Sequence, residues 1–203
     1  MPVLDPSMLS PVQRRQVGTI LTASFRREHH VELEKLLGAD RRVWVRVDDV
    51  GEVLGFATTQ LLAPLGVHYL GYLAVAPAGR DQGVGTSLLR HVLERARVDG
   101  AGAVVLEVED PDAATGDDDR VLRERRLAFY TRAGAVRLPL AWRTPFADGS
   151  GTEPMYLLWV PVSAPPPAGS ALLDLATGLY TLHYGLAADD PLVTSVLGSL
   201  NRA

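Results

Sequence analysis

The chain has 203 residues, 47% of them hydrophobic and 22% charged, and its 20 Lys and Arg against 24 Asp and Glu give a formal net charge of −4. This composition predicts one main folded domain with a sizeable core, and the mild acidity without a block of basic residues argues against a nucleic-acid partner. The lack of cysteine excludes disulfides, thiolate metal sites and a cysteine nucleophile. The sequence contains no run of about 18 apolar residues, so it predicts no membrane-spanning helix.

The N-terminal region predicts two helices and no secretory signal. Residues 1–15 lack the basic start and apolar run of such a signal, so we expect a cytoplasmic protein. Between residues 10 and 40, apolar residues recur at spacings near three and four, the period of amphipathic helices. Gly38 is expected to end the second helix.

The central part of the chain alternates between strand and helix patterns. A turn at 49–51 joins two segments of period two, which predicts a β-hairpin. In chain order, the patterns predict strands at 43–47, 53–61, 68–75, 103–109, 135–140 and 155–162, and helices at 86–98 and 121–132. This order predicts an α/β or α+β fold, in which helices cover one sheet.

Three prolines at 165–167 predict a stiff spacer near the end of the chain. We therefore divide the chain into a main domain, residues 1–162, and a helical C-terminal extension, residues 163–203. Apolar residues from Leu172 to Leu186 fall on one face of a helix. That face suits either a contact with the chain's own sheet or a homodimer, and the pattern fits both.

A glycine-rich turn precedes the helix at 86–98 and carries the clearest chemical signal. It reads Arg80-Asp81-Gln82-Gly83-Val84-Gly85-Thr86. Backbone N–H groups at a helix start lack intrahelical partners and lie at the positive end of the helix dipole, so they bind phosphate. The two glycines let a phosphate approach the backbone and tolerate a positive φ, and Arg80 adds a charged donor.

Three kinds of phosphate-binding loop compete for this turn. A Walker loop needs Gly-Lys followed by Ser or Thr, which the turn lacks. A dinucleotide fingerprint needs a third glycine where Leu88 stands, although Glu107 and Glu109 follow at the distance of its ribose-binding acid. The third pattern is Arg or Gln, two residues, Gly, one residue, then Gly or Ala. Residues 80–85 match this third pattern residue for residue.

The third pattern resembles the coenzyme A loop of the Gcn5-related N-acetyltransferases (GNAT), and the resemblance covers about residues 10–162. The strands at 70–75 and 105–109 are similar to the family's fourth and fifth strands. Ala128-Phe129-Tyr130, with Gly134 four residues later, resembles the family's Ala-x-x-Phe-Tyr-x-x-x-Gly helix. An Asn that often precedes that helix is missing, and an acidic loop stands in its place.

The resemblance implies a GNAT-like mixed, mostly antiparallel sheet whose fourth and fifth strands splay apart around acetyl-CoA. It implies an acyl-CoA-dependent N-acyltransferase that passes an acetyl group directly to a primary amine of a small molecule or peptide. Without cysteine, an acyl-enzyme on a thiol is unavailable, which favours this direct route. No metal and no membrane partner are expected. The residues expected to bind the cofactor are Leu73, Ala74, Val75, Arg80, Asp81, Gln82, Gly83, Val84, Gly85, Thr86 and Phe129.

The resemblance also assigns one catalytic role, and the acidic residues of the sequence offer candidates for a second. Tyr130 is expected to protonate the leaving thiolate. The candidates for the base that deprotonates the amine are Glu107, Glu109 and Glu28. Strand alternation places Glu107 and Glu109 on one face, opposite Val108, and Glu109 is favoured because it lies nearer the carboxyl end of the strand.

Two questions stay open on the sequence alone. A non-catalytic acyl-CoA-binding sensor or partner module would carry the same loop and strands. The acceptor is also open, because the acids at Glu28 and 109–112 favour a cationic amine, whereas Arg143 and the arginines between 120 and 126 suit an anionic one.

Overall fold

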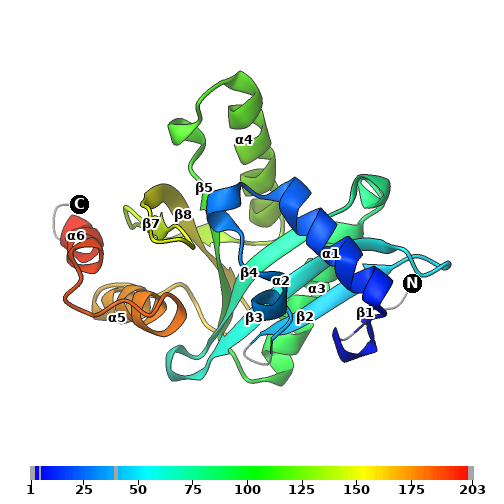
Figure 1. Cartoon of the computed structure of the whole chain (residues 1–203). Coiled ribbons are helices and arrows are strands. Elements are labelled where there is room, and N and C mark those ends of the chain that lie inside the picture. The colour runs from blue at the N-terminus through cyan, green and yellow to red at the C-terminus, as the bar shows by residue number, and fades with distance from the viewer. Residues whose placement is uncertain (1–2, 5, 39–40, 201–203) are drawn as a thin grey trace.

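The computed structural model describes residues 3–4, 6–38 and 41–200 and is built around one mixed sheet (Figure 1). The strand order is β1-β2-β3-β4-β5-β8-β6, and β7 pairs with β8 beside this path. Every pair is antiparallel except the parallel pair of β4 and β5, as the resemblance implied. The strands are β1 (Val3–Leu4), β2 (Arg42–Val47), β3 (Val53–Leu62), β4 (Val67–Val75), β5 (Ala103–Glu109), β6 (Val136–Arg137), β7 (Arg143–Pro145) and β8 (Thr152–Pro161).

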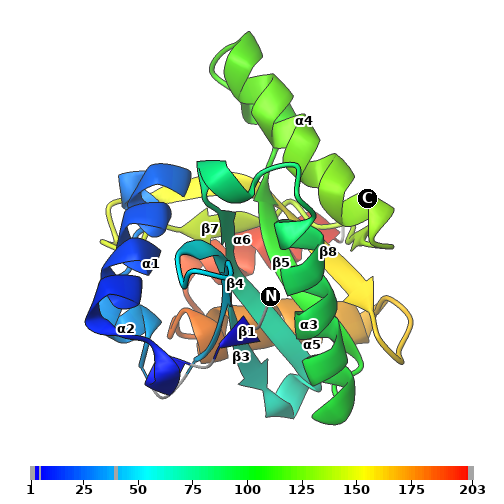
Figure 2. The same ribbon diagram turned by 90° about the vertical axis from the view of Figure 1, so that its right-hand side faces the viewer.

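Helices cover both faces of this sheet. Figure 2 shows α1 and α3 on opposite faces, and α4 projecting beyond one end of the strands. Among the described residues, no helix is both long and apolar enough to cross a membrane. The helices are α1 (Pro11–Ser24), α2 (Leu33–Leu36), α3 (Val84–Val98), α4 (Asp117–Arg132), α5 (Ser170–Gly178), α6 (Pro191–Leu200), the π-helix η6 (Leu179–His183) and short 3-10 helices at Pro6–Met8, Arg27–His29, Ala63–Leu65, Pro77–Gly79 and Pro111–Ala113.

The structure corrects three of the predicted elements. The strand predicted at 135–140 pairs over only two residues as β6, because Leu138 and Leu140 beyond it turn into the core. The segment between the strands predicted at 135–140 and 155–162, for which no element is predicted, contains β7. The helix predicted along the 172–186 stripe ends as an α-helix at Gly178 and continues as η6, a change of helix type that an apolar stripe does not encode.

The C-terminal extension packs on the chain's own sheet. Its buried residues Leu172 and Tyr180 share one hydrophobic cluster with Ala103 and Val105 of β5. The neighbouring residues of β5, such as Val108, point to the opposite face and join the cluster beneath α3. Most of the apolar face of the extension is therefore buried against its own chain, whereas Leu182 is exposed.

The parallel pair of β4 and β5 separates halfway along its length. The pairing runs from Val67–Ala103 to Leu70–Leu106 and stops there, although β4 continues to Val75 and β5 to Glu109. Beyond this point the backbones of β4 and β5 form no hydrogen bonds with each other. Backbone N–H and C=O groups require partners, so this opening is suited to a ligand that supplies them.

Candidate active site

The separation of β4 and β5 opens a cavity of about 520 Å³ that α3 and α4 also border. All of the predicted cofactor-binding residues line it except Gln82, whose side-chain amide donates to the Ala78 carbonyl oxygen (2.6 Å). The predicted catalytic residues Glu107, Glu109 and Tyr130 line it as well. Tertiary structure thus brings the separate motifs of the sequence together around one space.

The glycine-rich turn presents free backbone donors to this cavity. The Ser87 N–H donates to the Gly83 carbonyl oxygen (2.9 Å) as the first bond of α3, so the three N–H groups of residues 84–86 have no intrahelical acceptor. Gly83 has a left-handed φ of +73°, which favours glycine. The predicted need for a positive φ does not hold at Gly85, which lies in the first turn of α3.

Gly85 has a steric role instead. A Cβ at this position would lie 3.5 Å from Val75 and 3.6 Å from the ring of Phe129, so it would occupy the space between β4 and α4. The absence of a side chain keeps that space open beside the free N–H groups. Together with the Arg80 side chain at the cavity wall, these features fit the phosphates of a ligand.

A second pocket of about 440 Å³ adjoins the first across the sheet. Phe25, Gly71, Glu107 and Glu109 line both spaces, so the two glutamates lie where the spaces meet. The rest of the second pocket is rich in aromatic rings from three separate parts of the chain, namely Tyr69 and Tyr72 of β4, Phe146 and Tyr184.

The two glutamates of β5 differ in their surroundings. Glu107 accepts hydrogen bonds from the hydroxyls of Thr144 and Tyr184, and within the described ranges it makes no ion pair. Burial raises the pKa of Glu107 above its usual value, and these hydroxyl donors partly oppose the rise. Glu109, in contrast, is paired with the guanidinium of Arg126.

Tyr130 lies on α4 beside Phe129, with ring centroids 4.9 Å apart. Its side chain is largely buried, and burial raises the pKa of the Tyr130 hydroxyl far above its usual value. The nearby guanidinium of Arg126 opposes that rise. The hydroxyl is therefore protonated at neutral pH and available as a hydrogen-bond or proton donor.

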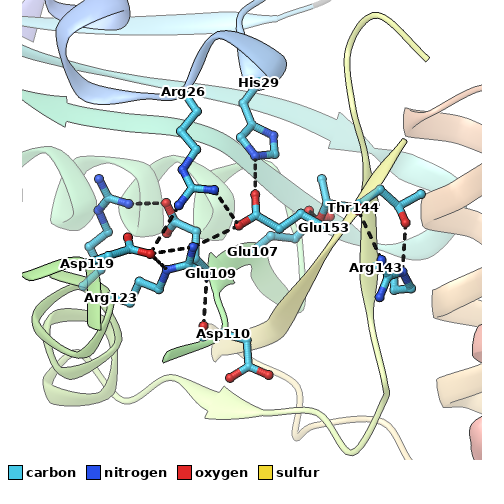
Figure 3. Close-up of polar contacts among 12 residues, drawn as sticks. Arg26, His29, Glu107, Glu109, Asp110, Asp119, Arg123, Arg143, Thr144 and Glu153 are labelled. Atoms are coloured by element: carbon cyan, nitrogen blue, oxygen red, sulfur yellow. Dashed lines mark hydrogen bonds and ion pairs between the residues drawn. The ribbon is translucent and has the colours of Figure 1, made fainter. Parts of the chain in front are cut away.

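A buried ionic cluster that sequence reasoning missed supports the site (Figure 3). Arg123 of α4 is 1% exposed and contacts Glu153 of β8 (Nη2–Oε1 3.2 Å) and Asp119 (Nη2–Oδ2 3.0 Å). The other oxygen of Glu153 lies 2.8 Å from Nε2 of His29, and Arg26 also reaches Glu153. The hydrogen bond from His29, with Arg26 and Arg123 nearby, lowers the pKa of Glu153.

The cluster joins three segments of the site. It links the loop after α1, which lines the second pocket, to α4, which carries Tyr130, and to the start of β8. The spacing of four between Asp119 and Arg123 is its one local sequence signal. The contact between Arg26 and Glu153 joins residues 127 positions apart, which a local pattern does not reveal.

The sheet opens between its parallel strands beside a helix start with free N–H groups, which is the arrangement that the resemblance to the GNAT family implied. The match to a family model agrees with this resemblance. The model of the Acetyltransferase (GNAT) family matches residues 11–134, more than half of the chain. The chain therefore belongs to the GNAT family of acetyltransferases, which use acetyl-CoA.

Individual acetyltransferases also resemble this chain, in sequence or in fold. Streptothricin acetyltransferase from Streptomyces lavendulae is 37% identical over 75 residues, which span 37% of this chain and 40% of that protein. A GNAT-family protein from Bacteroides thetaiotaomicron has a TM-score of 0.69 at 24% identity and covers 92% of this chain and 100% of its own. An aminoglycoside 6'-N-acetyltransferase solved with coenzyme A has a TM-score of 0.62 at 21% identity, covering 83% and 100%. The two structures show a shared fold.

Proposed function

We propose that this protein transfers an acetyl group from acetyl-CoA directly to a primary amine of a small molecule or peptide. The observation that carries the proposal is the meeting of two pockets at Glu107 and Glu109. One pocket has the donors that a phosphate-bearing cofactor needs, and the other has room for an acceptor. A residue at their junction can reach the nitrogen that attacks.

The residues of the first cavity fit coenzyme A. Arg80 and the free N–H groups of residues 84–86 would hold its phosphates. The unpaired edge of β4 at Leu73 and Val75 would hold its amide-bearing arm in the manner of an added strand. Bound acetyl-CoA supplies the activated acetyl thioester.

Glu107 is proposed as the base that takes the proton of the acceptor ammonium. The raised pKa of Glu107 moves its carboxylate toward the basicity that proton transfer near neutral pH requires. The carboxylate of Glu109, in contrast, is engaged in an ion pair with the guanidinium of Arg126. The geometry thus supports Glu107 over Glu109, which strand position alone favoured.

Acetyl-CoA binding is expected to stabilise the protein against heat. A ligand at about 100 times its dissociation constant adds roughly 2.7 kcal/mol, which for a chain of this size raises the unfolding midpoint by about 5 to 10 °C. NAD is expected to give no shift, and Arg80→Ala should reduce the shift with acetyl-CoA. Differential scanning fluorimetry measures all three. A shift with NAD alone would replace the proposal with the dinucleotide interpretation.

A measurement of amine acetylation distinguishes an enzyme from a non-catalytic module that only binds acyl-CoA. The match to streptothricin acetyltransferase supports beginning an acceptor screen with streptothricin, followed by polyamines, aminosugars, basic peptides and amines that carry a carboxylate. Release of free coenzyme A with acetylation of one of these amines supports the enzyme. Tight binding of acetyl-CoA without acetylation of any amine would support a sensor or partner module.

Tyr130→Phe is expected to lower kcat by about tenfold or more, because the variant loses a protonated hydroxyl at the cavity wall. The shift of the unfolding midpoint with acetyl-CoA should persist, since the ring is kept. Steady-state kinetics with the acceptor identified above measures the effect. Tyr156→Phe is the matched control, because Tyr156 packs under Arg137 (3.4 Å from Cζ to the ring centroid) and lines neither pocket. An unchanged kcat in Tyr130→Phe would remove Tyr130 from the mechanism.

A further inference from the structure

The C-terminal extension reaches the junction of the two pockets. Directly after η6, the Tyr184 hydroxyl lies 2.8 and 2.9 Å from the two carboxylate oxygens of Glu107, to which it donates. The Tyr69 hydroxyl of β4 lies 3.1 Å from the Tyr184 hydroxyl. Because the one proton of Tyr184 serves Glu107, the Tyr69 hydroxyl is the donor in this second bond. A chain of two hydroxyls therefore ends on the proposed base.

The segment that carries Tyr184 is firmly anchored. Tyr180 of η6 is fully buried, stacks on Trp142 with ring centroids 4.2 Å apart, and donates to the Arg143 carbonyl oxygen (2.7 Å). On the other side, Nδ1 of His183 lies 2.7 Å from the Gln60 side-chain oxygen. π-helical turns are rare and occur frequently at functional sites. These contacts fix the place of the residue that follows.

The same segment forms part of the acceptor pocket. His183, Tyr184 and Leu186 line the second pocket together with Tyr69 and Glu107. These residues approach Glu107 from the face opposite α3, the face on which strand alternation places Glu107 itself. The extension thus supplies one wall of the space in which an acceptor amine would meet the base.

We propose that Tyr184 is a positioning residue for Glu107 and that His183, Tyr184 and Leu186 form a wall of the acceptor site. The proposal rests on the proposed function and extends the site beyond the segment that matches the family model. A buried carboxylate without a cationic partner needs hydroxyl donors to stay ionised and to keep one orientation. Tyr184 supplies such a donor, and Thr144 of β7 supplies another.

The proposal predicts a change in pH dependence. The groups that face Glu107 are the hydroxyls of Thr144, Tyr184 and Tyr69 and the indole N–H of Trp142, and burial is the cause that raises the pKa of Glu107. The nearby Tyr180 hydroxyl donates to the Arg143 carbonyl oxygen instead. Donors to a carboxylate favour its charged form, so loss of one donor raises the pKa of Glu107. Because a base must be ionised to act, the acidic limb of the kcat/KM profile then moves to higher pH.

Tyr184→Phe tests this prediction, and Tyr180→Phe is the matched control, because it removes a hydroxyl four residues earlier in the same anchored segment. In Tyr184→Phe we expect kcat at neutral pH to fall about tenfold and the acidic limb to rise by about one pH unit. The shift of the unfolding midpoint with acetyl-CoA should stay as in the wild type. In Tyr180→Phe the acidic limb should keep its place. If Tyr184→Phe does not fold, Thr144→Val removes the other donor and should move the limb in the same direction.

A second readout does not depend on turnover. The carboxyl ¹³C NMR signal of Glu107, assigned by its loss in Glu107→Gln, titrates with the pKa of Glu107. We expect this pKa to be higher in Tyr184→Phe than in the wild type and in Tyr180→Phe. An equal pKa in all three proteins overturns the positioning role. Absence of acetylation by the wild type would instead overturn the proposed function, whatever the titration shows.

Discussion

Glu107→Gln is expected to lower kcat by about 100-fold or more at neutral pH, the usual contribution of a general base. Glutamine keeps the size of the side chain and an oxygen that can accept from Tyr184, but it cannot take a proton. Steady-state kinetics across pH measures the effect. In the wild type, kcat/KM should rise as the pH increases through the pKa of Glu107, which lies above the usual value, and this limb should vanish in the variant.

Glu109→Gln is the matched control on the same strand and the same face. Its carboxylate is already paired with Arg126, so we expect a loss in kcat of less than about tenfold and an unchanged acidic limb. A larger loss in Glu109→Gln than in Glu107→Gln would identify Glu109 as the base. It would also show that the position of a glutamate along β5, rather than its hydrogen-bond and ion-pair partners, decides which one acts as the base.

Arg123→Ala is expected to destabilise the fold by about 3 kcal/mol, because it removes the buried guanidinium from Glu153 and leaves this carboxylate only Arg26 and His29 as partners. For a chain of this size the unfolding midpoint should fall by roughly 10 °C. Thermal or denaturant unfolding measures the loss. Arg125→Ala is the matched control on the same helix, because the pair of Arg125 and Asp81 is exposed and contributes less than about 1 kcal/mol. Equal losses in both variants would show that burial does not govern this cluster.

The same cluster predicts how stability depends on pH. The pKa of Glu153 is lower in the folded protein than in the unfolded chain, so the cluster stabilises the fold above the unfolded value of about 4.3. That stabilisation is lost as the pH falls through the lowered folded value. The difference in stability between wild type and Arg123→Ala should therefore narrow in acid. A constant difference across that range would mean that Arg123 acts through packing alone.

The sequence by itself determined the local parts of this protein. Periods of two and of 3.6 predicted the strands β2 to β5 and the helix α3, because the alternation of side chains is a property of each element alone. The order of Arg80, Gly83 and Gly85 predicted the turn at the start of α3 for the same reason. Neighbouring residues in one turn specify free N–H groups and a left-handed φ.

Only the tertiary structure decided which of these parts share a site. The place at which β4 and β5 separate depends on the register between two strands about 35 residues apart along the chain, and the choice between Glu107 and Glu109 depends on which side chains approach each from other elements. Tyr184 donates to Glu107, which lies 77 positions earlier in the chain, and Arg123 donates to Glu153, which lies 30 positions later. Such contacts arise when separate elements bury their apolar faces against one sheet, and a linear pattern holds no record of which polar side chains that burial brings together.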